Sequence, residues 1–232
     1  MRTALALIAA SFAAILAAPA LAADAAHPTV IELFQSQGCS SCPPANANVM
    51  ALADRPDNLV LSFGVTYWDQ LGWKDRFAQP EFTRRQYAYQ GGLGHDNVWT
   101  PQTVINGRTD VTGVRAGELA QAVKAGDRGT GGPALTATAR QINITAGSGS
   151  ASKGADVWLV RYDPRIIQVP IKAGENSGRT LPHRNVVQAL VHLGNVTAAT
   201  AAFPRPAATA GLAEAVLVQR PNGGVILAAL KL

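Results

Sequence analysis

The stretch ELFQSQGCSSCPPAN, residues 32–46, contains both cysteines of the chain, Cys39 and Cys42. The apolar residues 30–34 predict a short strand leading into it, and apolar positions recur at helical spacing over residues 45–53. Pro43 and Pro44 follow the second cysteine, where the first turn of a helix tolerates proline. The cysteine pair is therefore expected at a junction between a strand and a helix.

The residues that follow complete an α/β pattern. The near-continuous apolar run 59–65 is typical of a buried parallel strand, which predicts a right-handed β-α-β unit. The polar and aromatic segment 67–94 is interpreted as an insertion over the core, with a helix at 80–90. A strand, an Asn-Gly hairpin turn and a last helix are predicted at 102–105, 106–107 and 118–124.

The glycine-rich residues 125–133 have no apolar periodicity and are the best candidate for a linker. Beyond them, short apolar segments alternate with turn signals, which predicts a small β-sandwich. Its strands are expected at residues 135–145, 157–162, 166–171, 186–193, 215–219 and 225–230.

The first 22 residues have the pattern of a secretory signal peptide. Arg2 precedes an apolar run, residues 4–18, and the small-residue motif Ala20-Leu21-Ala22 is suited to cleavage. The apolar run is shorter than the roughly 20 residues that span a bilayer. We therefore expect a periplasmic or secreted protein with no stable membrane insertion after cleavage.

The charge distribution argues against nucleic-acid binding. Lys and Arg number 20 and Asp and Glu 15, so the net charge is +5, and the positive residues are dispersed. Two cysteines are also too few for a disulfide framework in an exported chain of this size. The pair is therefore expected to be functional rather than structural.

A Cys-x-x-Cys pair at the start of a helix is suited to thiol–disulfide exchange. The helix N-terminus stabilises a thiolate, so Cys39 is the expected nucleophile, and Cys42 would resolve the mixed disulfide. Protein or small-molecule thiols and disulfides are the expected partners, and we expect neither a cofactor nor a resident metal.

Two other functions remain open. The pair can be an inert disulfide in a secreted, non-catalytic binding module, or it can carry copper with His95 as a third ligand. Zinc lacks further thiolate ligands. Covalent haem attachment requires a histidine directly after Cys42, where Pro43 stands.

These motifs resemble the thioredoxin fold. More narrowly, ELFQSQGCSSCPPAN, WTPQTVINGR and GENSGRTLPHRNVVQAL are similar to a bacterial family of secreted proteins that has a thioredoxin-like domain and no assigned function. The resemblance implies a thioredoxin-like α/β domain, residues 27–126, with a helical insertion. A small β-rich, sandwich-like domain, residues 133–232, would follow it.

The resemblance also implies roles for individual residues. Pro101 corresponds to the cis-proline that faces the cysteine pair and shapes the substrate edge, and Thr100 precedes it. Glu32 corresponds roughly to the buried acid that moves a proton for the resolving thiol. Its spacing to Cys39 is one residue longer than in thioredoxin.

Two further groups of residues are candidates for recognition. Trp68 and Trp99, together with Trp73, are expected near the cysteine edge, where they would form an apolar substrate groove. The polar segment GENSGRTLPHRN, residues 174–185, is a candidate for binding an anionic partner or the first domain, or is simply a solvated connection.

Overall fold

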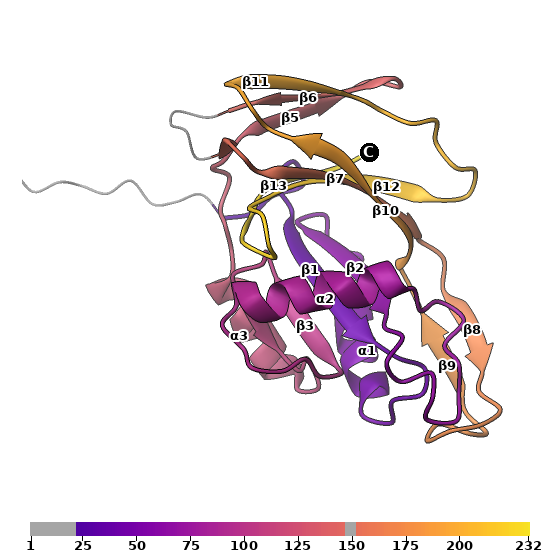
Figure 1. Ribbon diagram of the computed structural model, residues 1–232. Helices are drawn as coiled ribbons and strands as arrows, with labels where there is room; N and C mark the ends of the chain where they lie inside the picture. The colour runs from indigo at the N-terminus through magenta and orange to yellow at the C-terminus, as the bar shows by residue number, and fades with distance from the viewer. Residues whose placement is uncertain (1–21, 147–151) are drawn as a thin grey trace, which may run out of the picture.

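The computed structural model describes residues 22–146 and 152–232 of the chain (Figure 1). The predicted signal peptide therefore lies outside the described residues, except for its last position. Three helices are found in the described part: α1 (Cys42–Met50), α2 (Pro80–Gly92) and α3 (Ala116–Ala125). None of them is long and apolar enough to cross a membrane.

The strands of the N-terminal half are β1 (Thr29–Gln35), β2 (Asn58–Gly64), β3 (Gln102–Ile105) and β4 (Thr109–Val111). Those of the C-terminal half are β5 (Ala134–Ala137), β6 (Gln141–Thr145), β7 (Asp156–Asp163), β8 (Ile167–Pro170), β9 (Thr180–His183), β10 (Val186–Asn195), β11 (Thr200–Pro204), β12 (Ala213–Gln219) and β13 (Ile226–Lys231).

Eight strands form one mixed sheet in the order β13-β12-β7-β10-β2-β1-β3-β4. Strand β1 is parallel to β2 and antiparallel to β3, and β3 is antiparallel to β4. Asn106 and Gly107 both have positive φ, 49° and 61°, as a tight β3–β4 hairpin turn requires. The fold is thus mixed α/β, as the sequence predicts.

The main sheet contains strands from both sides of the linker predicted at residues 125–133. Strand β10 pairs in parallel with β2 at Val186 and Ser62, and the Ser62 N–H donates to the Asn185 carbonyl at 2.9 Å. Without β10, this edge of β2 would have unpaired backbone donors and acceptors. The start of β10 pairs with β2 there. Strands from both halves therefore share one hydrogen-bonded layer.

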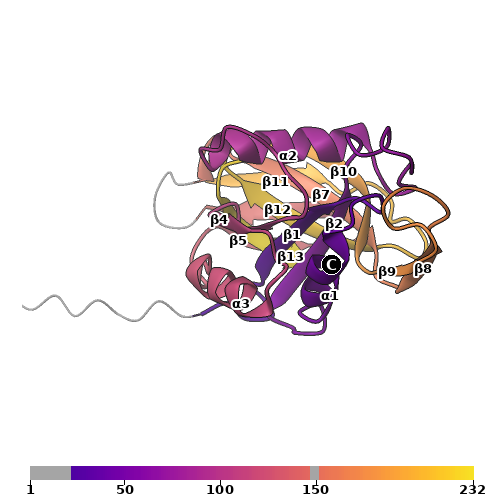
Figure 2. The same ribbon diagram turned by 90° about the horizontal axis from the view of Figure 1, so that it is seen from below.

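The two faces of the sheet carry different helices because side chains alternate along each strand. Ile31 and Leu33 point into a core with α1 and α3, whereas Val30 and Phe34 join the core under α2. Figure 2 shows α2 on one side of the sheet and α1 with α3 on the other. Glu32 has the same parity as Val30 and Phe34, so it faces α2.

The β-rich half is predicted as a separate sandwich-like domain, but its strands β7, β10, β12 and β13 belong to the main sheet, and the rest of it forms a second, smaller layer. A three-stranded sheet, β11-β6-β5, packs on β7 and β12 through Ile142, Ile144, Val157, Leu159 and Val216. Figure 1 shows this layer above the main sheet. The segment predicted as one strand, residues 135–145, is instead the β5–β6 hairpin.

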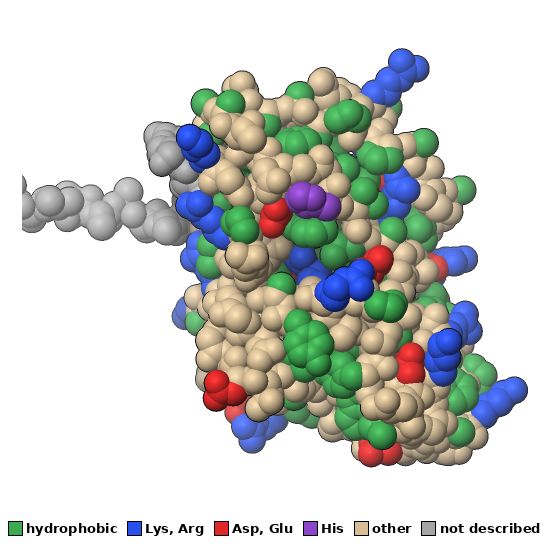
Figure 3. Space-filling view, in the orientation of Figure 1, with side chains coloured by type: hydrophobic (Ala, Val, Ile, Leu, Met, Phe, Trp, Pro, Cys, Tyr) green, Lys and Arg blue, Asp and Glu red, His purple; other side chains and the backbone are tan. Residues whose placement is uncertain are grey.

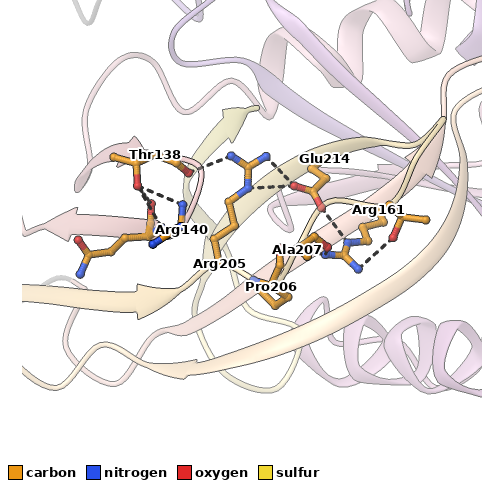
Figure 4. A network of polar contacts seen from close by, with 9 residues as sticks. Thr138, Arg140, Arg161, Arg205, Pro206, Ala207 and Glu214 are labelled. Carbon is orange, nitrogen blue, oxygen red and sulfur yellow. Dashed lines mark hydrogen bonds and ion pairs between the residues drawn. The ribbon is translucent and has the colours of Figure 1, made fainter.

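A buried carboxylate ties the two layers together (Figure 4). Glu214 on β12 accepts hydrogen bonds from Arg161 Nε at 2.8 Å and from Arg205 Nη2 at 2.7 Å. Arg205 Nη1 also donates to the Thr138 carbonyl, and Arg161 Nη2 donates to the Ala207 carbonyl. Both guanidinium groups are thus fixed by the same carboxylate, which gives this group a structural role.

Candidate functional site

Cys39 and Cys42 form a disulfide in the loop between β1 and α1. We call residues 36–42 the Cys loop. It is a pair of tight turns: the Cys39 N–H donates to the Ser36 carbonyl at 3.1 Å, and the Cys42 N–H donates to the Cys39 carbonyl at 3.2 Å. Cys42 is the first residue of α1, so the disulfide lies at the predicted junction of strand and helix.

The disulfide is covered, contrary to the prediction of an accessible Cys39. Cys39 is 0% exposed and Cys42 is 1% exposed, while Ser40 and Ser41 between them are exposed. A thiolate must reach a sulfur along the S–S axis to exchange with it. Exchange therefore requires a movement that uncovers the pair.

The cover is the β8–β9 loop, residues 171–179, from the C-terminal half. Asn176 is fully buried and its Nδ2 donates to the carbonyls of Gln37 and Cys39, at 3.0 and 2.9 Å. The neighbouring Glu175 accepts a hydrogen bond from the Ser40 N–H at 2.9 Å. The Ser40 side chain is the main cause of the lowered pKa of Glu175, and this backbone N–H is the second. The polar segment 174–185 thus contacts the Cys loop.

The groups that stabilise a thiolate also differ from the prediction. Pro43 and Pro44 have no N–H, and the Cys42 N–H is already used by the Cys39 carbonyl. Few free N–H groups therefore remain at the start of α1. Instead, Ser41 Oγ lies 3.3 Å from Cys39 Sγ, where its hydroxyl can donate to a Cys39 thiolate.

A cavity of about 180 Å³ lies beside Cys42 and contains an unusual histidine. His183, on β9, lines this cavity and is 3% exposed, and its Nε2 has no hydrogen-bond partner in the described part of the chain. Burial lowers the pKa of His183 to about 4, assisted by the charge of Arg76. A neutral imidazole with an unused nitrogen therefore shares a cavity with the second cysteine.

The other side of the Cys loop is held by residues from the segment after β2. Trp73 Nε1 donates to Gln37 Oε1 at 3.0 Å, and the Gln37 N–H donates to Asp75 Oδ2 at 2.8 Å. Burial raises the pKa of Asp75 to about 6, although it also accepts the Phe77 N–H. Two titratable groups, Asp75 and His183, are therefore buried around the Cys loop.

Glu32 does not have the position that its predicted proton-relay role requires. It is fully buried, but its carboxylate binds Arg85 Nε at 2.7 Å and also accepts from the Tyr89 hydroxyl. Both partners are on α2, whereas Cys42 begins α1 on the opposite face of the sheet. The alternation of side chains along β1 thus separates Glu32 from the cysteines.

The Thr100-Pro101 peptide bond is cis, and Pro101 is buried. Gln102 pairs with Phe34 in the β1–β3 register, which puts Pro101 beside the end of β1, where the chain enters the Cys loop. Thr100 is half-buried at the same edge. The structure thus brings Pro101 to the sheet edge that carries the cysteines.

The tryptophans predicted as a groove have different neighbours. Trp68 packs against the core under α2, and Trp99 stacks edge-on against His95 with ring centroids 4.8 Å apart. Trp73 is the one that contacts the Cys loop. His95 Nε2 is 3.0 Å from Asp110 Oδ1. Over residues 22–146 and 152–232, no three His, Cys, Asp or Glu side chains gather in a way that could hold a metal ion.

The fold and the site together define a mixed α/β protein with a covered Cys-x-x-Cys disulfide. Residues 30–219 match the family model described as a protein of unknown function, DUF1223, and the chain belongs to this family. No curated protein matches it.

Two solved structures are similar to the chain. The crystal structure of protein AGR_C_4864 from Agrobacterium tumefaciens is 31% identical, with a TM-score of 0.72, and the match covers 90% of this chain and 94% of that one. HBP35 of Porphyromonas gingivalis is 13% identical, with a TM-score of 0.55, and the match covers 89% of this chain and 75% of that one. The second likeness concerns the fold alone.

Proposed function

We propose that this protein is a thiol–disulfide oxidoreductase of the periplasm or the extracellular space, with a thioredoxin-like unit that carries Cys39 and Cys42. Its partners are protein or small-molecule thiols and disulfides. The leader pattern of residues 1–22 supports the location, since disulfides persist outside the cytoplasm. The DUF1223 family description assigns no activity, so the proposal depends on the site.

The strand order supports the thioredoxin-like unit. The order β2-β1-β3-β4, with β1 parallel to β2 and β3 antiparallel to β1, accompanies a Cys loop between β1 and α1. Helices α1 and α3 share one face and α2 covers the other. The segment 67–94, predicted as a helical insertion, carries α2 and lies between β2 and β3 in the chain.

One observation carries the chemistry: the buried, unpaired His183 Nε2 in the cavity beside Cys42. An incoming thiolate attacks Sγ of Cys39, the S–S bond breaks, and Cys42 leaves as a thiolate. Attack of a second substrate thiol on the mixed disulfide then releases the oxidised substrate, and Cys39 leaves as a thiolate. Two electrons thus pass from substrate to protein, and the Cys42 thiol, once protonated, has His183 as its hydrogen-bond acceptor.

Trapping tests this function. In Cys42→Ala, the free Cys39 should accumulate mixed disulfides with thiol partners, because no second sulfur resolves them. Cys39→Ala should trap far less, since in the proposed exchange the partner sulfur bonds to Cys39 and Cys42 is the leaving group. Mass spectrometry after acid quenching measures both. Equal, negligible trapping by the two variants, together with slow alkylation of each free thiol, would exclude exchange.

A second candidate is the binding module with an inert disulfide, and the burial of both cysteines favours it. In that case the β8–β9 loop is a permanent cover and the disulfide only fastens the Cys loop. The two functions differ in one measurable quantity. An inert pair is reduced only when the protein unfolds, whereas an exchanging pair is reduced while the rest of the chain stays folded.

A further inference from the structure

A second enclosed cavity of the described chain lies away from the cysteines, between elements of both halves. Its volume is about 420 Å³, within the range typical of small-molecule sites. It is enclosed between α2 and the strands β7, β10 and β12, with the β12–β13 turn at one side. Figure 3 shows a hollow in the middle of this face, surrounded by basic, acidic, histidine and apolar side chains.

The cavity contains a buried guanidinium with unused donors. The Arg85 side chain is 5% exposed and lines the cavity. Of its five N–H groups, Nε and Nη2 bind Glu32, and Nη2 also donates to the Tyr89 hydroxyl. The two N–H groups of Nη1 have no acceptor among the described residues. Glu32 and Tyr89 thus hold Arg85 in one orientation and leave one donor pair available.

The charges at the cavity favour a singly charged anion. Arg84 and Arg220 also line it, and neither has an acidic partner in the parts of the chain that are described. Two carboxylates, Glu81 and Asp156, are present as well, and Asp156 is occupied by His192 at 3.0 Å. The three arginines and two carboxylates that line the cavity leave one net positive charge, which a monocarboxylate neutralises and a doubly charged phosphate exceeds.

One wall is apolar and flat. Trp158 and Leu190 line the cavity, and the Trp158 ring packs against the His192 ring with centroids 4.7 Å apart. The Arg85 guanidinium carbon is 5.9 Å from the centre of the Trp158 ring. A ligand whose anionic group reaches Arg85 would therefore lay its apolar part against the indole.

The opposite wall is firmly built. Gln219 Nε2 donates to the Tyr89 hydroxyl at 3.0 Å and to the Gly224 carbonyl at 2.9 Å, which fixes the β12–β13 turn to α2. Gly223, with φ of 69°, packs so closely on the Ala88 carbonyl that a Cβ atom would clash with it. The cavity is therefore preformed, which lowers the entropic cost of binding.

We propose that this cavity binds a small monocarboxylate with an aromatic or branched apolar body. The carboxylate accepts hydrogen bonds from Arg85 Nη1, Arg84 and Arg220 attract it at the mouth, and Trp158 with Leu190 covers the apolar part. This site is independent of the cysteine chemistry, since none of its residues lies in the Cys loop.

Calorimetric titration with phenylacetate, with phenylacetamide as the neutral control, tests the site. We expect saturable binding of one phenylacetate per chain. The affinity for the amide should be lower by roughly tenfold or more. Equal binding of acid and amide, or no binding of phenylacetate, isovalerate or indole-3-acetate into the millimolar range, would overturn the proposal.

Variants locate the binding. Arg85→Lys keeps a positive charge opposite Glu32 but removes the Nη1 donors, and should weaken phenylacetate binding roughly tenfold. Trp158→Leu should also weaken phenylacetate binding, and this substitution leaves the buried ion pair of Glu32 and Arg85 in place. Arg140→Gln, an exposed arginine that does not line the cavity, should leave binding unchanged. A loss in Arg140→Gln equal to that in Trp158→Leu would contradict the assignment.

Discussion

Two buried polar regions lie on opposite sides of the sheet, and they differ in whether their titratable groups form ion pairs. Under α2, Glu32, Arg85 and Tyr89 bind one another. Beside the Cys loop, His183 Nε2 has no partner in the described chain, and burial shifts the pKa values of His183 and Asp75. A buried charge that keeps its counter-charge is compatible with a stable fold, whereas an unpaired polar group near a reactive pair indicates chemistry.

The largest expected effect is on stability, at the buried ion pair of Glu32 and Arg85. Glu32→Met leaves Arg85 buried without its carboxylate and should lower the free energy of unfolding by about 3–5 kcal/mol. Asp57→Asn removes an exposed ion pair with Arg55 and should cost less than about 1 kcal/mol. Urea unfolding measures both. Glu32→Met should leave the rate of disulfide exchange unchanged, and a large loss of rate would restore Glu32 as the proton relay.

The pH dependence of stability should separate the two titratable groups near the Cys loop. Because the pKa of His183 is lowered to about 4, the unfolded state takes up a proton first, so stability falls as pH drops from about 6.5 to 4. Because the pKa of Asp75 is raised to about 6, the folded state keeps a proton longer, so stability falls as pH rises from about 4 to 6. Over its pH range, each group changes the free energy of unfolding by on the order of 3 kcal/mol in total.

In the wild type these slopes have opposite signs and largely cancel. Asp75→Asn should therefore expose the His183 slope alone, and His183→Phe should expose the Asp75 slope alone. Unfolding by urea at several pH values between 4 and 7 measures them. Slopes of the same sign in the two variants would show that other groups dominate this range.

The exchange rate should depend on His183 more than on its neighbours. His183→Ala should slow native-state reduction of the disulfide by dithiothreitol roughly tenfold, because the Cys42 thiol then loses a hydrogen-bond acceptor worth about 1.4 kcal/mol. Added imidazole should restore part of the rate in His183→Ala but not in His183→Phe, where the ring fills the space. Leu181→Met, in the same cavity, is the matched control and should stay near wild type.

An effect of similar size concerns the cover. Asn176→Ala removes two hydrogen bonds to the Cys loop and should speed reduction roughly tenfold, since each 1.4 kcal/mol that favours opening gives a factor of ten. Asn48→Ala is a matched control. It removes two similar bonds, to the Gly113 and Val114 carbonyls, without touching the disulfide. Equal acceleration by both variants would mean that global stability, not the cover, sets the rate.

The sequence predicts the local elements better than their assembly. Strand and helix periodicity locate β1, α1, β2, α2 and β3 closely, because each is encoded by its own residues. Strands β9 and β11 are missed because they are short and only partly apolar. The pairing of β10 with β2 joins residues more than a hundred positions apart, and no local pattern encodes such a contact.

The same distinction applies to the candidate site. Sequence motifs are enough to select Cys39, Cys42 and Pro101. A motif also selects Glu32, but the alternation of side chains along β1 directs Glu32 to the face of the sheet opposite α1. His183 and Asn176 come from the C-terminal half and meet the Cys loop only through tertiary packing. Their signal was the polar density of residues 174–185, which predicted contact with either a partner or the first half.

A redox titration of the folded protein shows whether Cys39–Cys42 exchanges with thiols. The chain is equilibrated with glutathione buffers of increasing reducing strength, quenched and alkylated, and mass spectrometry measures the fraction that is reduced. Circular dichroism monitors the fold in the same buffers. We expect a two-electron transition of Cys39–Cys42 between about −120 and −270 mV, the range of thiol–disulfide exchange proteins, with the fold retained. A disulfide that stays oxidised below about −300 mV, or is reduced only as the chain unfolds, would contradict it.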